Sequence, residues 1–459
     1  MDVEILSRIQ FAFTISFHYI YPPLSIGIGL MLVISEGMFL KTHKKKYEVL
    51  TRFWTKIFAL TFGIGVATGI VMEFEFGTNW ATYSRYVGDI FGSALAAEGI
   101  FAFALESSFL GILLFGWNKV SPKVHFISTL GVFLGSMFSA IWIVVANSWQ
   151  QTPAGYHIVG EGMMAKAEIT DFWEMVFNPS SVERILHVWV GAFLAGAFLY
   201  ISVHAYYLVR DRHQEISKTG IKLGLIAATV FSLVQLFLGH LSADGVAKNQ
   251  PAKLAAFEGH YYTEDPADLY LFGWVDQENK EVYGVKIPGG LSLLLYQTFD
   301  DKVTGLDKFA VEDQPSQVNA IFQFYHLMVG IGMLLIGLSL LGSFLLWRKQ
   351  LFNHKWLLWI FVFAVILPQL ANQFGWFAAE MGRQPWVVYG LLRTSDALSK
   401  AVSADQVLFS LIMFSLIYSL LLVLFIYLLN KKIKHGPEDA HLIDHRPHQQ
   451  NINNFFTKD

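Results

Sequence analysis

The sequence has no cysteine and few charged residues. With no cysteine among its 459 residues, the chain cannot form disulfides, thiolate metal sites, iron–sulfur clusters or a CxxCH haem attachment. Charged residues make up only 15% of the chain, and a formal net charge of -3 gives no basis for binding nucleic acid. Any metal would therefore depend on His, Met or carboxylate ligands.

Hydrophobic residues make up 54% of the chain, which includes 40 Phe and 13 Trp, and the mean hydropathy is +0.44. This composition is typical of a polytopic membrane protein and not of soluble domains. The segment 1–10 carries charges and has no cleavable signal pattern, so the first apolar stretch is expected to remain as a helix. Stretches long enough to span a bilayer lie near 12–38, 53–76, 92–116, 125–148, 185–208, 218–242, 318–345, 355–380 and 405–430. The predicted fold class is an all-α polytopic membrane protein with nine transmembrane helices.

Basic residues predict the orientation of these spans. The connections after spans two and eight contain few of them. The connections after the odd-numbered spans contain Lys41, Lys44, Lys45, Lys46, Arg52, Lys119, Lys123, Arg210, Arg212, Lys218, Lys222, Arg348, Lys349, Lys355, Lys431, Lys432 and Lys434. By the positive-inside rule the N-terminus is expected outside, on the periplasmic side, and the C-terminus in the cytoplasm.

The spans divide the chain into four parts. Residues 1–242 are expected to hold transmembrane helices 1–6, and residues 318–434 to hold helices 7–9. Residues 243–317 are too many for an ordinary connection, and their aromatic residues and the turn at 287–290 favour a folded external flap. Residues 435–459 are expected to form a polar, disordered cytoplasmic tail. No internal repeat is evident, which disfavours a transporter built from inverted repeats.

A polar corner ends the eighth span, at Glu380–Trp386. An ionisable group at membrane depth costs at least ~2.5 kcal/mol, so such groups are kept mainly where they have a function. Gly382 and Pro385 end the helix there, and irregular backbone at that depth is tolerated only where it lines a cavity. A polar or metallic group is therefore expected against Glu380 and Arg383, although the two could also form a structural ion pair that caps the helix.

Possible haem-iron ligands fall in the outer part of the predicted spans: His18, His187, Met328 and Glu380. His with Met is an axial pair of low-spin haem, and a single His or carboxylate leaves the open iron position that oxygen binding requires. Each residue alone also has a simpler interpretation, such as a hydrogen-bonded anchor for His or core packing for Met. Their shared depth favours a multi-haem membrane redox protein.

The chain closely resembles subunit I of the cytochrome bd-type quinol oxidases over essentially its whole length. The matching stretches are Ser7–Phe11 with His18, Phe76–Trp80, Asn147–Pro153, Gln250–Glu258 and Gly382–Trp386. The short external flap is similar to that of the cyanide-insensitive branch. One position departs from some members, which carry Arg or Lys where this chain has His326, and His326 is also a rival ligand to Met328.

The resemblance implies roles for individual residues. His187 and Met328 match the axial pair of a low-spin haem b, and His18 and Glu380 match the ligands of two high-spin haems. The remaining matches are Glu98, beside the His18 haem and in some members its iron ligand; Glu106 and Ser139, on the proton path; Trp376, between haems; Arg383 and Gln384, at the cofactor; and Lys253 and Glu258, at the quinol site.

The resemblance also implies cofactors, partners and location. Three haems are expected: the low-spin haem b, a high-spin haem b, and a haem d or a further haem b. Expected partners are oxidase subunit II, small single-span accessory subunits, ubiquinol or menaquinol, oxygen and the lipid bilayer, in the bacterial cytoplasmic (inner) membrane. The implied enzyme is a quinol oxidase that reduces oxygen to water. Two alternatives remain open from the residues alone, a proton- or cation-coupled secondary transporter and a non-catalytic haem anchor.

Overall fold

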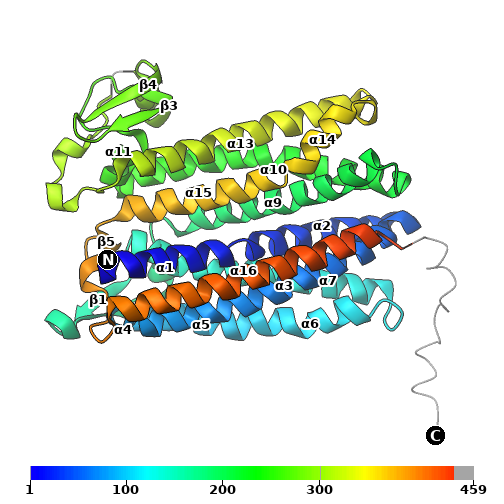
Figure 1. Cartoon of the computed structure of the whole chain (residues 1–459), viewed down its shortest axis with the longest axis horizontal. Coiled ribbons are helices and arrows are strands. Elements are labelled where there is room, and N and C mark those ends of the chain that lie inside the picture. The colour runs from blue at the N-terminus through cyan, green and yellow to red at the C-terminus, as the bar shows by residue number, and fades with distance from the viewer. Residues whose placement is uncertain (1, 300, 439–459) are drawn as a thin grey trace, which may run out of the picture.

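The computed structural model describes residues 2–299 and 301–438, which form a bundle of long helices lying side by side (Figure 1). Within this described part, nine helical segments are long and apolar enough to cross a membrane, as predicted. The spans are α1 (Val3–His18) with α2 (Tyr21–Thr42), α3 (Lys45–Thr78), α5 (Gly88–Ala97) through α6 (Ala104–Phe115), α7 (Pro122–Gln151), α9 (Ser181–Val209), α10 (Gln214–Asn249), α13 (Val318–Trp347), α14 (Lys355–Phe363) with α15 (Ile366–Arg383), and α16 (Ala404–His435).

Three spans are interrupted within the membrane. The first breaks between His18 and Tyr21, because Pro22 and Pro23 occupy the first turn of α2, where a missing backbone N–H is tolerated. The eighth breaks between α14 and α15, just before Pro368. The third contains the π-helical turn η1 (Glu98–Phe103). Predicted ligand or proton-path residues lie at each break or on the helix that follows it.

One end of the bundle carries all the strands of the described residues and most of the short helices of the connections, and we call it the flap end. There the segment expected as a flap is folded into α11 (Pro251–Glu258), the hairpin β3 (Leu269–Asp276)–β4 (Glu281–Ile287), and α12 (Gly290–Tyr296). Helix α10 continues to Asn249, beyond the boundary at 242 given by hydropathy. The other elements at this end are α4 (Ala81–Tyr86), β1 (Tyr156–Val159), β2 (Lys166–Ile169), α8 (Phe172–Val176), β5 (Trp386–Val388) and β6 (Leu392–Arg393).

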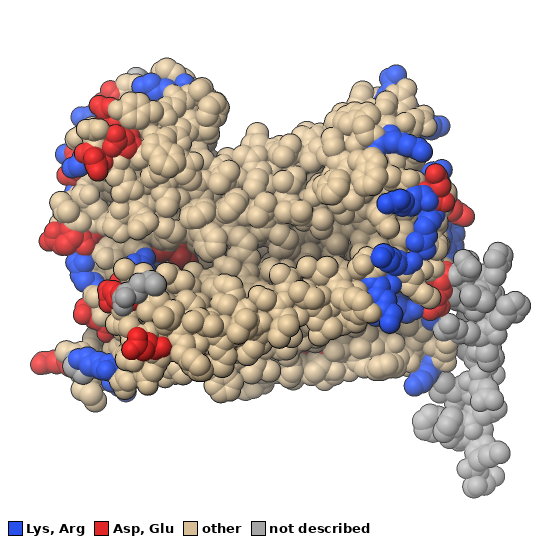
Figure 2. Space-filling model, viewed as in Figure 1, with Lys and Arg blue, Asp and Glu red and all other residues tan. Residues whose placement is uncertain are grey.

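The opposite end, which we call the basic end, gathers Lys and Arg on the face seen in Figure 2, whereas the flap end mixes both signs of charge. Lys44 and Arg348 lie here, next to the ends of α2 and α13. The expected cytoplasmic tail, 435–459, falls mostly outside the described residues.

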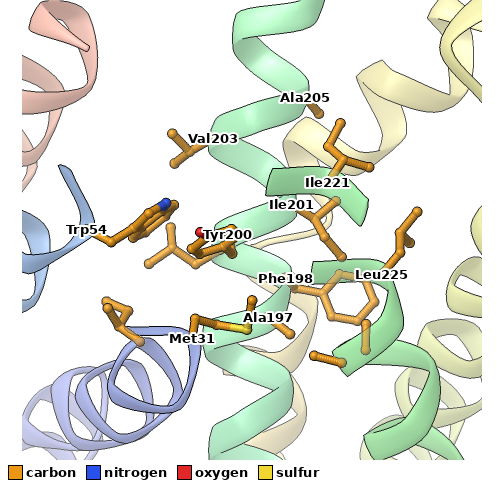
Figure 3. Packing of buried hydrophobic residues seen from close by; sticks show 14 of the residues in the cluster. Met31, Trp54, Ala197, Phe198, Tyr200, Ile201, Val203, Ala205, Ile221 and Leu225 are labelled. Carbon is orange, nitrogen blue, oxygen red and sulfur yellow. The ribbon is translucent and has the colours of Figure 1, made fainter. Parts of the chain in front are cut away.

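The main core surrounds α9. Phe198, Tyr200 and Ile201 on this helix pack against Trp54 of α3 and Leu225 of α10 (Figure 3). Helices α2 and α9 approach closely where Gly27 faces Gly196, since a Cβ on Gly27 would lie 2.6 Å from the Gly196 nitrogen. Small residues allow such approaches in membranes, where van der Waals packing drives helix association. This packing fixes α9, which carries His187.

Candidate haem and quinol sites

Helix α15 contacts the surroundings of all four predicted haem ligands. Its residue Gln373 donates to the Ser16 carbonyl at 2.8 Å, next to the break that contains His18. A Cβ on Gly375 would lie 2.8 Å from the Met328 sulfur, and the Asn372 amide packs against Gly191, one turn from His187. Glu380 lies in the last turn of α15 itself. The structure therefore brings the predicted ligands together around the half of α15 nearest the flap end.

Glu380 is held by a cation and two amides. The Arg383 guanidinium donates to one carboxylate oxygen. The other oxygen accepts from Asn147 Nδ2 at 3.0 Å and from Gln151 Nε2 at 3.3 Å. Arg383 is only 4% exposed, so the charges of this pair compensate each other away from water.

Two more cations lie one contact away from Glu380. Arg184 donates to the Asn147 amide oxygen, and the buried Lys253 ammonium donates to Gln151 Oε1 at 2.7 Å. Burial, reinforced by the positive charge of Arg184, holds the pKa of Lys253 well below its usual range. The last turns of α7 thus connect both cations to Glu380.

Two predicted cofactor residues at this corner are already engaged within the protein. Arg383 also donates from Nη1 to Gln150 Oε1 and from Nε to the Trp386 carbonyl, both at 3.2 Å. The Gln384 amide oxygen accepts from Thr394 Oγ1 at 2.7 Å, which points its side chain to the following loop. The resemblance to Asn147–Pro153 marked the amides as part of a motif without giving them this role.

His18 ends α1 and faces α3. Its Nδ1 lies 3.0 Å from the Thr68 hydroxyl, and a Cβ on Gly69 would lie 3.2 Å from its Cε1, so Gly69 makes room for the ring. Trp376, one turn before Glu380, packs edge-on against Tyr19 with ring centroids 5.7 Å apart. Trp376 therefore lies between the surroundings of His18 and those of Glu380.

His187 has a nitrogen suited to binding iron. Its Nε2 lies 3.1 Å from the Gln235 amide nitrogen, and its buried Nδ1 has no partner in hydrogen-bonding geometry among the described residues. A neutral imidazole nitrogen is a common metal ligand, and the sulfur of Met328 on α13 packs against Gly375 of α15. These residues fit a haem held by His187 and Met328.

The contacts of the rival ligand His326 disfavour it as an iron ligand. Its Nδ1 lies 2.9 Å from the Phe322 carbonyl oxygen and its Nε2 lies 2.8 Å from the Tyr270 carbonyl oxygen. Both ring nitrogens face backbone acceptors, so neither is directed at an iron. The ring also stacks on Phe322, with centroids 3.8 Å apart.

Glu98 and Glu106 face one helix. Glu98 accepts from Ser139 Oγ, a residue expected together with Glu106 on the proton path, whereas Glu106 accepts from Ser136 Oγ, which was not predicted. Eight positions along a regular helix would turn the two carboxylates about 80° apart at 3.6 residues per turn. The π-helical turn η1 adds a residue and brings both onto the side facing α7.

Glu258 lies at the other end of α11 from Lys253. It is buried beside Tyr325, and its Oε2 is 4.0 Å from His326 Nε2. Burial raises the pKa of Glu258 to about 8, against a smaller opposing effect of the Tyr325 hydroxyl. Lys253 and Glu258 thus belong to separate networks, one at Glu380 and one under the hairpin.

Comparison with known proteins identifies the family of this chain. The profile of the family described as cytochrome bd terminal oxidase subunit I matches residues 6–437. The chain belongs to this family. It is 37% identical to cytochrome bd ubiquinol oxidase subunit 1 of Bacillus subtilis (strain 168), with 95% of each chain covered. It is 34% identical to cytochrome bd-II ubiquinol oxidase subunit 1 of Escherichia coli (strain K12), over 95% of this chain and 97% of that one.

The fold is likewise similar to a solved bd oxidase, from Geobacillus thermodenitrificans. The TM-score is 0.88 at 30% sequence identity, over 95% of this chain and 99% of that one. Membership confirms the predicted family, the helical membrane fold, the oxidase class with haem cofactors and the bacterial inner-membrane location. It does not support the transporter or haem-anchor alternatives.

Proposed function

We propose that this chain is the haem-bearing catalytic subunit of a quinol:oxygen oxidoreductase that oxidises quinol at the flap end and reduces oxygen to water. The single observation that carries the proposal is the convergence of His18, His187, Met328 and Glu380 around one half of α15. Two relatives with over 30% identity are named ubiquinol oxidases, which supports quinol as the electron donor.

His187 and Met328 would hold a low-spin haem b. His18 and Glu380 would each hold a high-spin haem, one of them haem b and the other haem d or a second haem b. Bound haem supplies reversible one-electron chemistry and, where one axial position is open, a place for oxygen. The protein's part is to fix the ligands: Thr68 and Gly69 orient His18, and Asn147, Gln151 and Arg383 orient Glu380.

Quinol oxidation requires an acceptor for the protons that leave the substrate. Glu258 supplies one, because its buried carboxyl has an oxygen without a hydrogen-bond partner in the described chain. Lys253, on the same helix, connects this segment to the Glu380 network through Gln151. We therefore assign the quinol site to α11 and the hairpin that covers it.

Protons for oxygen reduction would come from the opposite side. Glu106 and Ser136, then Glu98 and Ser139, form two carboxyl–hydroxyl pairs along α7, with the Glu106 pair nearer the basic end. The gathering of Lys and Arg at that end supports a cytoplasmic location for it. Releasing protons outside and consuming protons from inside generates a proton motive force without a pump.

The name subunit I implies a partner, and we propose a membrane subunit II together with small single-span accessory subunits. The experiment that tests the proposal is therefore done on the purified complex. Pyridine haemochrome analysis should show b-type haem, and His187→Ala should remove the low-spin haem spectrum while leaving oxygen-binding haem. Retention of the low-spin spectrum in His187→Ala would refute that ligand, and a colourless wild-type complex would refute the proposal.

A further inference from the structure

The hairpin β3–β4 has two apolar faces, and the described residues cover only one of them. Tyr270, Val275 and Val282 point to the bundle and join a buried cluster with Phe322 of α13. Phe272 pairs with Val285 and Trp274 pairs with Tyr283, so these four side chains share the opposite face. Their exposed fractions are 63%, 49%, 62% and 56%, respectively.

Strand β3 lies along the first turns of α13. The Val275 backbone N–H donates to Asn319 Oδ1 at 3.0 Å, and Gln323 Nε2 donates to the Gly273 carbonyl at 2.7 Å. Deeper along the helix, His326 Nε2 lies 2.8 Å from the Tyr270 carbonyl oxygen. The strand therefore runs beside α13 from residue 319 to residue 326, and its uncovered face looks sideways, away from the bundle.

The length of α13 fixes the depth of the hairpin. Helix α13 ends at Trp347, followed by Arg348 and Lys349 at the basic end. A hydrocarbon core about 30 Å thick takes about 20 helical residues, so the apolar part of this span extends back to about Leu327. Residues 319–326, and β3 beside them, consequently lie at the level of the lipid headgroups.

The uncovered face has the composition of a membrane interface. Trp and Tyr concentrate at headgroup level, because their rings combine an apolar body with a polar group. In Figure 1 the hairpin stands beside the start of α13, and in Figure 2 its lobe projects sideways from the bundle at the flap end. The apolar side chains Leu327, Val329 and Met333 of α13 are also exposed just below this level, where lipid would meet them.

We propose that the hairpin 269–287 rests in the bilayer interface at the flap end, with Phe272, Trp274, Tyr283 and Val285 against lipid headgroups and the upper acyl chains. The occupant of this face is the lipid surface and not another protein. The hairpin covers Glu258 and His326 from the side, since the Tyr270 carbonyl contacts His326, which lies 4.0 Å from Glu258. Lipid thus anchors the flap over that site.

The absence of cysteine makes a direct test simple. Phe272→Cys and Val285→Cys report on the uncovered face, and Glu278→Cys, in the exposed turn between the strands, is the matched control. Each variant complex carries an environment-sensitive thiol fluorophore in nanodiscs of phosphatidylethanolamine and phosphatidylglycerol. The labelled wild-type complex corrects for cysteines of other subunits, and an unchanged haem spectrum verifies folding.

We expect lipids with a nitroxide near the headgroup to quench the label at residues 272 and 285 severalfold more than at residue 278. Iodide dissolved in the water should quench the label at residue 278 more than at residues 272 and 285. Equal quenching by iodide at all three positions would place the face in water and overturn the proposal. Protection of residues 272 and 285 from both quenchers would show that a protein covers the face, which also overturns it. These outcomes do not depend on the haem or quinol assignments.

Discussion

Two regions of the molecule hold buried or partly buried carboxylates in different ways. At the flap end, Glu380 accepts hydrogen bonds from a guanidinium and two amides, and two further cations lie one contact away. Along α7, Glu98 accepts from the Ser139 hydroxyl and Glu106 accepts from the Ser136 hydroxyl. The first arrangement fixes a charge in place, whereas the second can pass a proton on.

The difference follows from what the donors can do. Guanidinium and amide groups donate in fixed directions and do not release their protons at ordinary pH, so they orient a carboxylate, and the guanidinium also compensates its charge. A serine hydroxyl rotates and both donates and accepts, so it can receive a proton on one side while giving one on the other. The comparison therefore supports the proposed iron-ligand role for Glu380 and the proposed proton-transfer role for Glu106.

Removing the cation at the flap end should have the largest effect. Arg383→Leu leaves the partly buried Glu380 without its partner, and breaking a fully buried ion pair from one side costs about 3–5 kcal/mol, which is the upper limit for this pair. We expect a large fall in the melting temperature of the complex in nanodiscs, together with loss of one high-spin haem. Melting curves and pyridine haemochrome analysis measure the two effects.

The control for this change is Arg393→Leu. Arg393 also pairs with a carboxylate, Asp313 at 2.6 Å, but this pair is partly exposed on the short strand β6 of the same end. Such a pair contributes about 0–1 kcal/mol, so stability should change little. Equal destabilisation by the two variants would mean that Arg383 has no special relation to Glu380.

Changing the carboxyl along α7 should affect turnover and not stability. Glu106→Gln keeps the shape and an acceptor for Ser136 but cannot carry a proton. Proton transfer by a positioned side chain contributes at least ~10²-fold, and we expect a slowing of oxygen consumption of that order with an unchanged haem spectrum. Oxygen-electrode rates at saturating quinol measure this.

Ser136→Ala is the matched control, because it keeps the Glu106 carboxyl and removes only its hydroxyl partner. Its expected effect is a much smaller loss of turnover. If Glu106→Gln consumes oxygen at the wild-type rate, the two regions no longer differ in function, and protons enter elsewhere.

The sequence allowed prediction of features that depend on long apolar runs. Nine spans followed from their length, since only stretches of about 20 residues cross the hydrocarbon core. The end of α10 did not follow, because Asp244 and Lys248 continue the helix to Asn249 beyond the membrane, where hydropathy carries no information. The folded flap was expected from its turn residues, but its contact with α13 depends on distant side chains.

The sequence allowed prediction of the candidate ligands of the site, but not of the hydrogen bonds that connect them to their neighbours. Single residues such as His187 and Glu380 stood out because they are polar within apolar segments. Arg184 did not, since a charge near the start of a span looks like an ordinary flanking residue. The π-helical turn that aligns Glu98 with Glu106 has no local sequence signal, because it arises from packing against α7.

Glu258 tests whether a third carboxyl behaves like Glu380 or like Glu106, because it pairs with neither a buried arginine nor a serine. Its expected effect is the smallest of the three. Burial raises its pKa to about 8, so the carboxyl is protonated below that pH and ionised above it. In the unfolded chain the same carboxyl ionises near pH ~4.3. The stability that its neutral form contributes to the folded protein is therefore complete below that pH and is lost as the pH rises through about 8.

Quinol oxidation should instead become faster as the pH rises, because only the ionised carboxyl of Glu258 accepts a proton from quinol. We expect kcat/KM for quinol to rise on the order of tenfold per pH unit below the pKa and to level off above it.

Glu258→Gln should remove that rise, whereas Glu281→Gln, on the exposed strand β4, should preserve it. Initial rates measured at limiting quinol from pH 6 to 9 show the difference directly. A rise that persists unchanged in Glu258→Gln would assign the proton acceptor to another group. A rise that is lost would place Glu258 with Glu106, among the carboxyls that this protein keeps free to exchange a proton.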